Sequence, residues 1–188
     1  NIYLMPASGG ELRQLTHLSS YNSTPCWSPD GKTIAFASQQ HHQTNLCHVD
    51  VKSGAAQPFV HTMVGNDGLS LSWNPGELIL YQRPGNRNYF LLNPETEKER
   101  PLLSNESAGW AFTPRFSPDG AYVSINRSLQ FDTPNSGLWR ISLKDSTELL
   151  LNRNRLFPIV WSNDGRWIFA RHLRDDRIDI VKIPTTGG

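Results

Sequence analysis

The chain has 188 residues, and its 18 Lys and Arg against 17 Asp and Glu leave a formal net charge of +1. That balance excludes the strongly basic surface that sequence-independent binding of nucleic acid requires. No apolar run approaches the ~20 residues that a membrane-spanning helix needs. We therefore expect neither a nucleic-acid partner nor insertion into a membrane.

A five-residue motif recurs four times along the chain. It is WSPDG at 27–31, WNPGE at 73–77, FSPDG at 116–120 and WSNDG at 161–165. Its aromatic residues are therefore 46, 43 and 45 positions apart, which matches the length of a four-stranded propeller blade. The repeat predicts an all-β fold, a β-propeller of four-stranded antiparallel blades with about four repeats that belongs to a larger propeller.

Each copy predicts the same order of strands, here named a, b, c and d. Strand a precedes the motif and strand b follows it, as at 33–37. Asp-Gly between two such runs is typical of a type I′ hairpin, in which both central residues have positive φ. We expect strand c at 45–51, 89–93, 138–143 and 178–183, and a strand d at 148–151. Pro and Gly interrupt the chain every few residues, so very little helix is expected.

The second copy departs from the pattern, because Asn74-Pro75-Gly76 stands where the others carry Asp-Gly and the span from Trp73 to Tyr81 is one residue shorter than that from Trp27 to Phe36. We expect a tighter or differently bulged hairpin there. The repeats are predicted at approximately 1–18 (partial), 19–62, 63–105, 106–152 and 153–188 (partial), together a single propeller segment over 1–188. Residues 1–10 align without gaps on 179–188, and from this shared phase we infer an excerpt of an array of six to eight blades.

The two cysteines, Cys26 and Cys47, are expected on strands a and c of one blade, with a strand between them. Next-nearest strands lie ~9.5 Å apart, whereas a disulfide needs Cα atoms within about 7 Å. The sequence therefore predicts two free thiols.

Residues 27–36 (WSPDGKTIAF) and 9–16 (GGELRQLT) resemble the WD-like repeats of the TolB-type WD40-like β-propeller family. The resemblance covers essentially the whole chain. It implies a bacterial protein that binds other proteins, in a periplasmic or extracytoplasmic setting. Propellers of this type occur in the Tol–Pal envelope system, as gating propellers of prolyl-oligopeptidase-like and tricorn-like peptidases, and as sensor ends of bacterial regulators and kinases.

Antiparallel order sorts the loops between two faces. The a–b and c–d turns are short and repetitive, and the b–c loops (39–44, 83–87, 126–136 and 171–176) and d–a connections vary. Variable loops on a rigid scaffold are where recognition residues concentrate. The candidates for ligand binding, at the entrance of the propeller tunnel, are Tyr21, Asn22, Asn66, Asp67, Trp110, Phe112, Arg155 and Phe157. For Trp110, Phe112 and Phe157, packing between blades is the alternative. The candidates on the loop face are His41, His42, Arg83, Arg87, Arg171, His172 and Arg174.

No catalytic or cofactor motif is found in the sequence. It has no G-x-S-x-G elbow, no H-E-x-x-H and no phosphate-binding Gly loop. Neighbouring Cys47 and His48 point to opposite faces of a strand, which argues against a metal site with His41 and His42. Asp30, Asp119 and Asp164 recur at a structural turn, and that requirement explains them. We therefore expect no metal site, no cofactor and no catalytic residues.

The leading hypothesis is a non-catalytic recognition or scaffold module that binds a protein, peptide or small ligand at the b–c and d–a loop face. One alternative is an accessory gating propeller of a prolyl-oligopeptidase-like or tricorn-like peptidase, which a G-x-S-x-G motif in adjoining sequence would reveal. Another is the sensor domain of a bacterial regulator or kinase. An enzyme such as a metal-assisted lyase would need His17, His61 or His172 to meet carboxylates at the axis.

Overall fold

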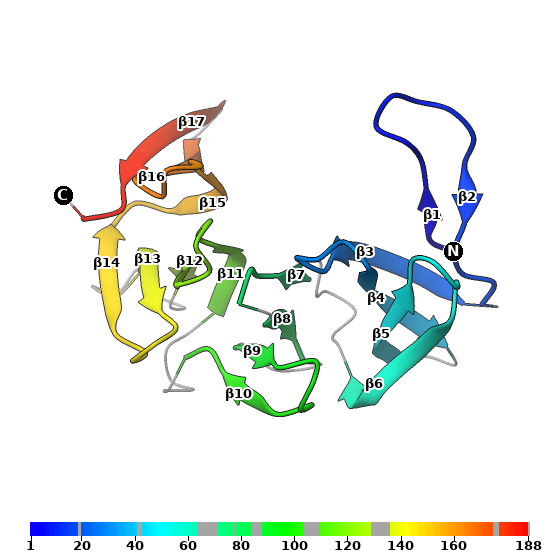
Figure 1. Cartoon of the computed structure of the whole chain (residues 1–188). Helices are drawn as coiled ribbons and strands as arrows, with labels where there is room; N and C mark the ends of the chain where they lie inside the picture. The colour runs from blue at the N-terminus through cyan, green and yellow to red at the C-terminus, as the bar shows by residue number, and fades with distance from the viewer. Residues whose placement is uncertain are drawn as a thin grey trace. The chain divides into compact units, whose positions relative to one another are not determined.

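The computed structural model describes residues 1–18, 20–40, 43–63, 71–76, 78–83, 88–103, 110–128, 136–174 and 177–187. None of these residues lies in a helix, so none forms a helix that could span a membrane. The strands form antiparallel sheets that follow one another along the chain (Figure 1). The all-β prediction is confirmed.

Every sheet is a meander whose strands pair in chain order. The first two strands form a short hairpin, β1 (Tyr3–Leu4) and β2 (Arg13–Gln14). Sheet 1 contains β3 (Tyr21–Trp27), β4 (Thr33–Gln40), β5 (Gln43–Asp50) and β6 (Ala56–Met63). Sheet 2 contains β7 (Ser72–Trp73), β8 (Ile79–Gln82), β9 (Tyr89–Leu92) and β10 (Glu99–Pro101). Sheet 3 contains β11 (Trp110–Phe116), β12 (Tyr122–Ser128), β13 (Gly137–Ser142) and β14 (Glu148–Asn152). Sheet 4 contains β15 (Leu156–Trp161), β16 (Trp167–Arg174) and β17 (Arg177–Pro184). Sheets 1, 2 and 3 each have the four antiparallel strands of a propeller blade.

The chain forms two compact units. The first consists of Asn1–Trp73, Glu77–Asn86 and Phe90–Arg100, and the second of Asn74–Gly76, Arg87–Tyr89 and Pro101–Gly188.

The a–b turns differ from the expected type I′ geometry. In sheet 1 the amide of Gly31 donates to the carbonyl oxygen of Ser28 at 3.0 Å, and the amide of Ser28 donates to the carbonyl of Thr33 at 2.8 Å. Gly31 has a φ of 69°, but Asp30 keeps an ordinary negative φ. The prediction that both central residues have positive φ is therefore wrong. The loop is longer than two residues, so a four-residue turn reverses the chain and only its last residue is left-handed.

The shorter hairpin of the second repeat is confirmed. Trp73 pairs with Ile79, whereas Trp27 pairs with Ile34, one residue further along. The side chain of Asn74 is buried, and its amide donates to the carbonyl oxygen of Gly120 at 3.2 Å. The residue that replaces the motif's serine therefore ties the second repeat to the a–b turn of the third.

Two of the repeat's aromatic residues, Trp73 and Trp161, pack between successive sheets, whereas Trp27 is 50% exposed. Trp73 lies against a buried cluster that includes Ala35, Phe59 and Tyr81, from sheets 1 and 2. Trp161 is 5% exposed, in a cluster with Leu138 of sheet 3. Within the first unit, sheet 1 is thus buried against sheet 2, and within the second unit sheet 3 is buried against sheet 4, as neighbouring blades are in a propeller.

Both thiols are free, as predicted. Cys26 lies on β3 and Cys47 on β5, with β4 between them. Burial raises the pKa of Cys26 to about 12 and that of Cys47 to about 11. Both are therefore protonated core residues.

Candidate functional site

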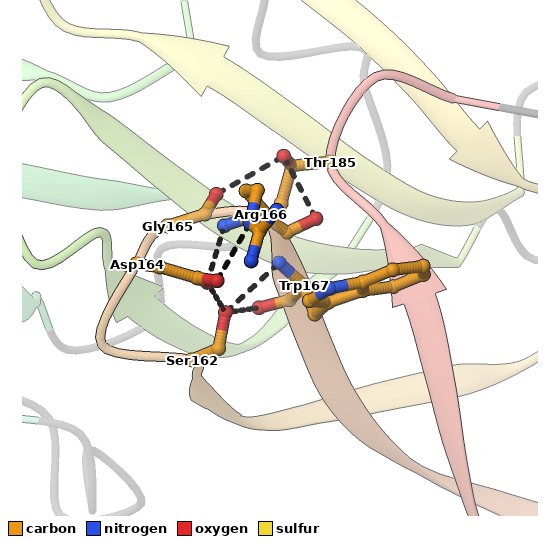
Figure 2. Close-up of polar contacts among 6 residues, drawn as sticks. All are labelled: Ser162, Asp164, Gly165, Arg166, Trp167 and Thr185. Carbon is orange, nitrogen blue, oxygen red and sulfur yellow. Dashed lines mark hydrogen bonds and ion pairs between the residues drawn. The ribbon is translucent and has the colours of Figure 1, made fainter.

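The carboxylates of the repeated a–b turns have structural partners. The hydroxyl of Ser162 donates to Asp164 at 2.5 Å and accepts from the amide of Trp167 at 3.0 Å (Figure 2). The amide of Arg166 donates to the same carboxylate at 3.1 Å, and the hydroxyl of Thr185 donates to the carbonyl oxygen of Gly165 at 3.1 Å. The bond from Ser162, followed by those from Arg166, holds the pKa of Asp164 well below its usual value. The turn thus explains this carboxylate without any catalytic role.

The same network recurs in the other two motifs that carry serine and aspartate. Ser28 donates to Asp30 at 2.7 Å, and Ser117 donates to Asp119 at 2.5 Å. In each case the pKa of the aspartate is lowered, first by the serine and then by the backbone amide two residues on. These turns are built alike in three sheets.

Two of the candidate ligand-binding residues, Phe112 and Phe157, meet in the second compact unit. Their rings pack edge to face, with centroids 6.3 Å apart and an angle of 62°. Arg171, which is paired with Phe157 across β15 and β16, has its guanidinium carbon 5.3 Å from the Phe157 ring centroid. Phe112 is 37% exposed. We call these residues the Phe112–Phe157–Arg171 cluster; the rings pack between sheets 3 and 4 and also remain accessible. Arg155 lies nearby in sequence and is exposed.

Bulges in the a strands shape this end of the sheets. In β11 the register shifts between Phe112 and Arg115, and Thr113 has a φ of 47°. The equivalent Thr24 in β3 has a φ of 50°. A bulge bends a strand and re-aims the side chains next to it. The Thr-Pro pairs at 24–25 and 113–114 are the sequence signal that could have located these bulges.

In the first compact unit, Tyr21 begins β3 and is 70% exposed. The side chain of Asn22 is engaged internally, since its Oδ1 accepts from the hydroxyl of Ser20 at 2.9 Å and its Nδ2 donates to the hydroxyl of Thr16 at 3.4 Å. Five further candidates, Asn66, Asp67, His41, His42 and Arg87, lie outside the described residues, and so does the side chain of Trp110, whose backbone is in β11.

The b–c hairpin of sheet 4 has a shorter loop than expected. Arg171, His172 and Arg174 lie within β16, because pairing with β17 continues to Arg174 opposite Arg177. Arg174 donates to Nδ1 of His172 at 3.3 Å and lies 3.3 Å from a carboxylate oxygen of Asp179. Arg174 and Arg177 are like charges that face each other across the strands, and the carboxylate of Asp179, 4.0 Å from Arg177 as well, offsets their repulsion at the hairpin end.

Arg83 also has partners within its own sheet. Its guanidinium carbon is 4.4 Å from the ring centroid of Phe90, and the group forms an ion pair with Glu99. In sheet 3, Arg127 lies 4.7 Å from the ring centroid of Trp139 and forms an ion pair with Glu148 at 2.9 Å. We call this arrangement the Arg–aromatic–Glu triad; sequence reasoning missed it because its members come from three strands.

A cavity of about 280 Å³ lies in the first compact unit, at the end of the sheets that carries the a–b and c–d turns. His48 stacks on Phe59 there, with centroids 4.5 Å apart and an angle of 29°. Burial lowers the pKa of His48 from its usual 6.5, partly offset by Glu97, so the imidazole is neutral at pH 7. Sequence reasoning assigned these turns a structural role only, although the carboxylates of Glu95 and Glu97 in a c–d turn were a visible signal. Among the described residues, no group of three or more His, Cys, Asp or Glu is placed to hold a metal ion.

No protein-family model matches the chain. It is 25% identical over 130 residues to the Tol-Pal system protein TolB of Francisella tularensis subsp. mediasiatica, a match that covers 68% of this chain and 30% of that protein. It is 28% identical over 134 residues to a TolB homolog of Chlorobium luteolum, covering 71% of this chain and 30% of the homolog. The match thus spans about a third of the length of these curated relatives.

Solved structures show the same fold. TolB from Acinetobacter baumannii superposes over 98% of this chain and 46% of its own, with a TM-score of 0.76 at 18% identity. An oligogalacturonate lyase from Vibrio parahaemolyticus gives 0.73 at 13% identity over 93% of this chain and 53% of its own. A puromycin-hydrolyzing peptidase of Mycobacterium tuberculosis gives 0.65 at 17% identity over 96% and 29%. Together, the repeated turn motif, the four-stranded sheets and these relatives support a TolB-type β-propeller fold for the chain.

Proposed function

We propose that this chain is a non-catalytic recognition module that binds a protein or peptide partner at the face formed by the b–c and d–a loops. The observation that carries the proposal is the Phe112–Phe157–Arg171 cluster, which offers accessible aromatic rings and a guanidinium at that face. Because relatives are proteins of the Tol-Pal system, the partner is a component of an assembly of that kind. The setting is then periplasmic or otherwise extracytoplasmic.

The chemistry of the cluster suits a protein partner. Aromatic residues and arginine are enriched among the residues that contribute most to the binding energy of protein interfaces. Contact with the Phe157 ring restrains Arg171 before binding, which reduces the entropy that its long side chain loses on binding. Tyr21, at 70% exposure, is a further aromatic residue that a partner would cover.

The likeness to the lyase and the peptidase is one of fold, at 13% and 17% identity. A fold hosts many unrelated functions, and function is decided by the site. The gating and sensor alternatives also place recognition, and not chemistry, on the propeller.

The test is a binding titration of the purified chain, by calorimetry, with each Tol–Pal component of the organism that encodes it. We expect one component to bind, and Phe157→Ala and Arg171→Ala each to weaken its Kd tenfold or more, which is typical of central interface residues. Two control variants remove similar groups elsewhere. Lys144→Ala removes an exposed cation from a c–d turn, and Leu12→Ala truncates a side chain between β1 and β2 that is 65% exposed. Both should leave the Kd unchanged. The proposal fails if no component binds, or if all four variants bind like the wild type.

A further inference from the structure

The cavity at the turn end of the first compact unit has aromatic walls and an acidic rim. Its lining includes Asp30, His48, Phe59, Trp73, Glu95 and Glu97. We propose that this cavity binds a guanidinium group, supplied by an arginine side chain of a partner polypeptide. The site uses none of the residues on which the proposed function depends.

The walls of the cavity offer faces on which a flat cation can stack. His48 and Phe59 form one stacked pair on β5 and β6, and Trp73 of β7 contributes an indole. A guanidinium stacks on aromatic faces and is less strongly hydrated than an ammonium. The neutral state of His48 adds no opposing charge.

The rim supplies carboxylates from two different sheets. Asp30 comes from the a–b turn of sheet 1, and Glu95 and Glu97 come from the c–d turn of sheet 2. A guanidinium has five N–H donors in one plane, so it can donate to carboxylates on more than one side. One cation near the rim, Lys32, lies 3.3 Å from Asp30. Both of these side chains are at least half exposed, and such pairs contribute little stability, so a ligand can displace Lys32 at small cost.

Elsewhere in the chain, an aromatic ring and a carboxylate together contact an arginine of the chain itself. In the Arg–aromatic–Glu triads of sheets 2 and 3, Arg83 and Arg127 each lie over a ring and pair with a glutamate. The cavity has the rings and the carboxylates, and none of the described residues that line it is an arginine. An arginine from outside would complete a third arrangement of this type.

The volume agrees with this occupant. Pockets for drug-sized ligands measure roughly 300–1,000 Å³, and about 280 Å³ accommodates one long side chain. A single residue in such a site binds weakly, so the affinity of a whole partner would come from contacts beyond the cavity as well.

The test is a titration followed by NMR, with N-acetyl-arginine amide as the probe and N-acetyl-citrulline amide, its neutral isostere, as the matched control. We expect the arginine probe to shift the resonances of His48 and of the Trp73 indole in a saturable manner, and the citrulline probe to shift neither. Glu95→Gln and Glu97→Gln should each weaken binding of the arginine probe at least fivefold. Glu11→Gln, an exposed carboxylate on another turn, should leave it unchanged.

Two further arms identify the source of the guanidinium and check the wall. Free L-arginine carries charged ends that the blocked probe lacks; if it bound more tightly, the ligand would be a free amino acid and the polypeptide source would be wrong. Phe59→Leu keeps an apolar side chain but removes the stacking face, so it should weaken binding of the arginine probe. The Glu95→Gln variant tests the contribution of charge separately. Equal binding of arginine and citrulline probes, or unchanged binding in both glutamine variants, would overturn the proposal.

Discussion

The indole Nε1 of Trp161 donates to the hydroxyl of Ser124 at 2.9 Å, and so joins the aromatic residue of one repeat to strand b of the repeat before it. The same nitrogen lies 3.1 Å from the carbonyl oxygen of Arg115. Between the second repeat and the first, the equivalent nitrogen is the buried Nε1 of Trp73, and it has no hydrogen-bond partner. The difference lies in the residue at the equivalent position of strand b. Ala35 pairs with Cys26 where Ser124 pairs with Arg115, so sheet 1 offers Trp73 no hydroxyl there.

Ala35→Ser is therefore expected to stabilise the protein. The new hydroxyl can accept from Trp73, and one satisfied buried donor contributes about 1 kcal/mol. The reverse change, Ser124→Ala, should cost about 1 kcal/mol, because Trp161 keeps its bond to Arg115. Urea denaturation measures both free energies of unfolding. A destabilised Ala35→Ser protein would mean that sheets 1 and 2 leave no room for the oxygen.

Gly137→Ala is expected to destabilise strongly. Gly137 has a φ of 143°, and a Cβ on it would lie 2.2 Å from the carbonyl oxygen of Asn152 and 3.0 Å from Cα of Arg153. Both neighbours are backbone atoms that cannot swing aside, so we expect a loss of about 3 kcal/mol. Gly165→Ala is the control: its φ is 68° and nothing lies within 4 Å, so it should lose about 1 kcal/mol. Thermal and urea unfolding compare the two, and equal losses would contradict the close approach.

Stability should fall between pH 4 and pH 2 through the turn carboxylates. Hydrogen bonds from Ser142 and then Thr147 lower the pKa of Asp145 from 3.8 to about 2. A lowered pKa means that the folded state binds its proton less readily than the unfolded state. The contribution is complete above pH 4 and is lost as the pH falls through about 2. Asp145→Asn keeps an oxygen that accepts from the Thr147 amide but removes the titration, so its Tm should fall less over this range than the wild-type Tm. Parallel curves for the two proteins would refute the assignment.

The two cysteines should resist alkylation in the folded protein. With pKa values of about 12 and 11, Cys26 and Cys47 hold very little thiolate at pH 8, whereas an unfolded thiol is substantially ionised there. Iodoacetamide should modify the native thiols at least about a hundredfold more slowly than the thiols in urea. Mass spectrometry follows the reaction, and also detects a disulfide between them, which the strand order excludes. Rapid labelling of either native thiol would show that its strand opens.

The repeat could be predicted from the sequence because a blade is built from hairpins between neighbouring segments. The spacing of Trp27, Trp73, Phe116 and Trp161 predicts the sheets, and the shortened motif at Asn74 predicts the altered hairpin that the structure contains. The cysteine prediction is confirmed for the same reason, since strand order alone separates Cys26 from Cys47. The type of the a–b turn was nevertheless predicted wrongly, because the φ of Asp30 is negative and not positive.

The residues of the candidate site could be predicted from the sequence only in part. The sequence indicated Phe112, Phe157 and Arg171 as residues at one end of the sheets, but whether the rings would pack together or face solvent depended on how sheets 3 and 4 meet. Arg83 looked like a loop cation, and its place over Phe90 depends on strands b, c and d being brought side by side.

The sequence by itself determined the antiparallel sheets and the free thiols, because both follow from hairpin periodicity over neighbouring residues. Only the tertiary structure decided what lies between the sheets: the edge-to-face rings, the Trp73 nitrogen without an acceptor, and the cavity of His48, Phe59 and Glu95. Those features join side chains that are tens of residues apart, and a one-dimensional repeat carries no measure of the distance between them.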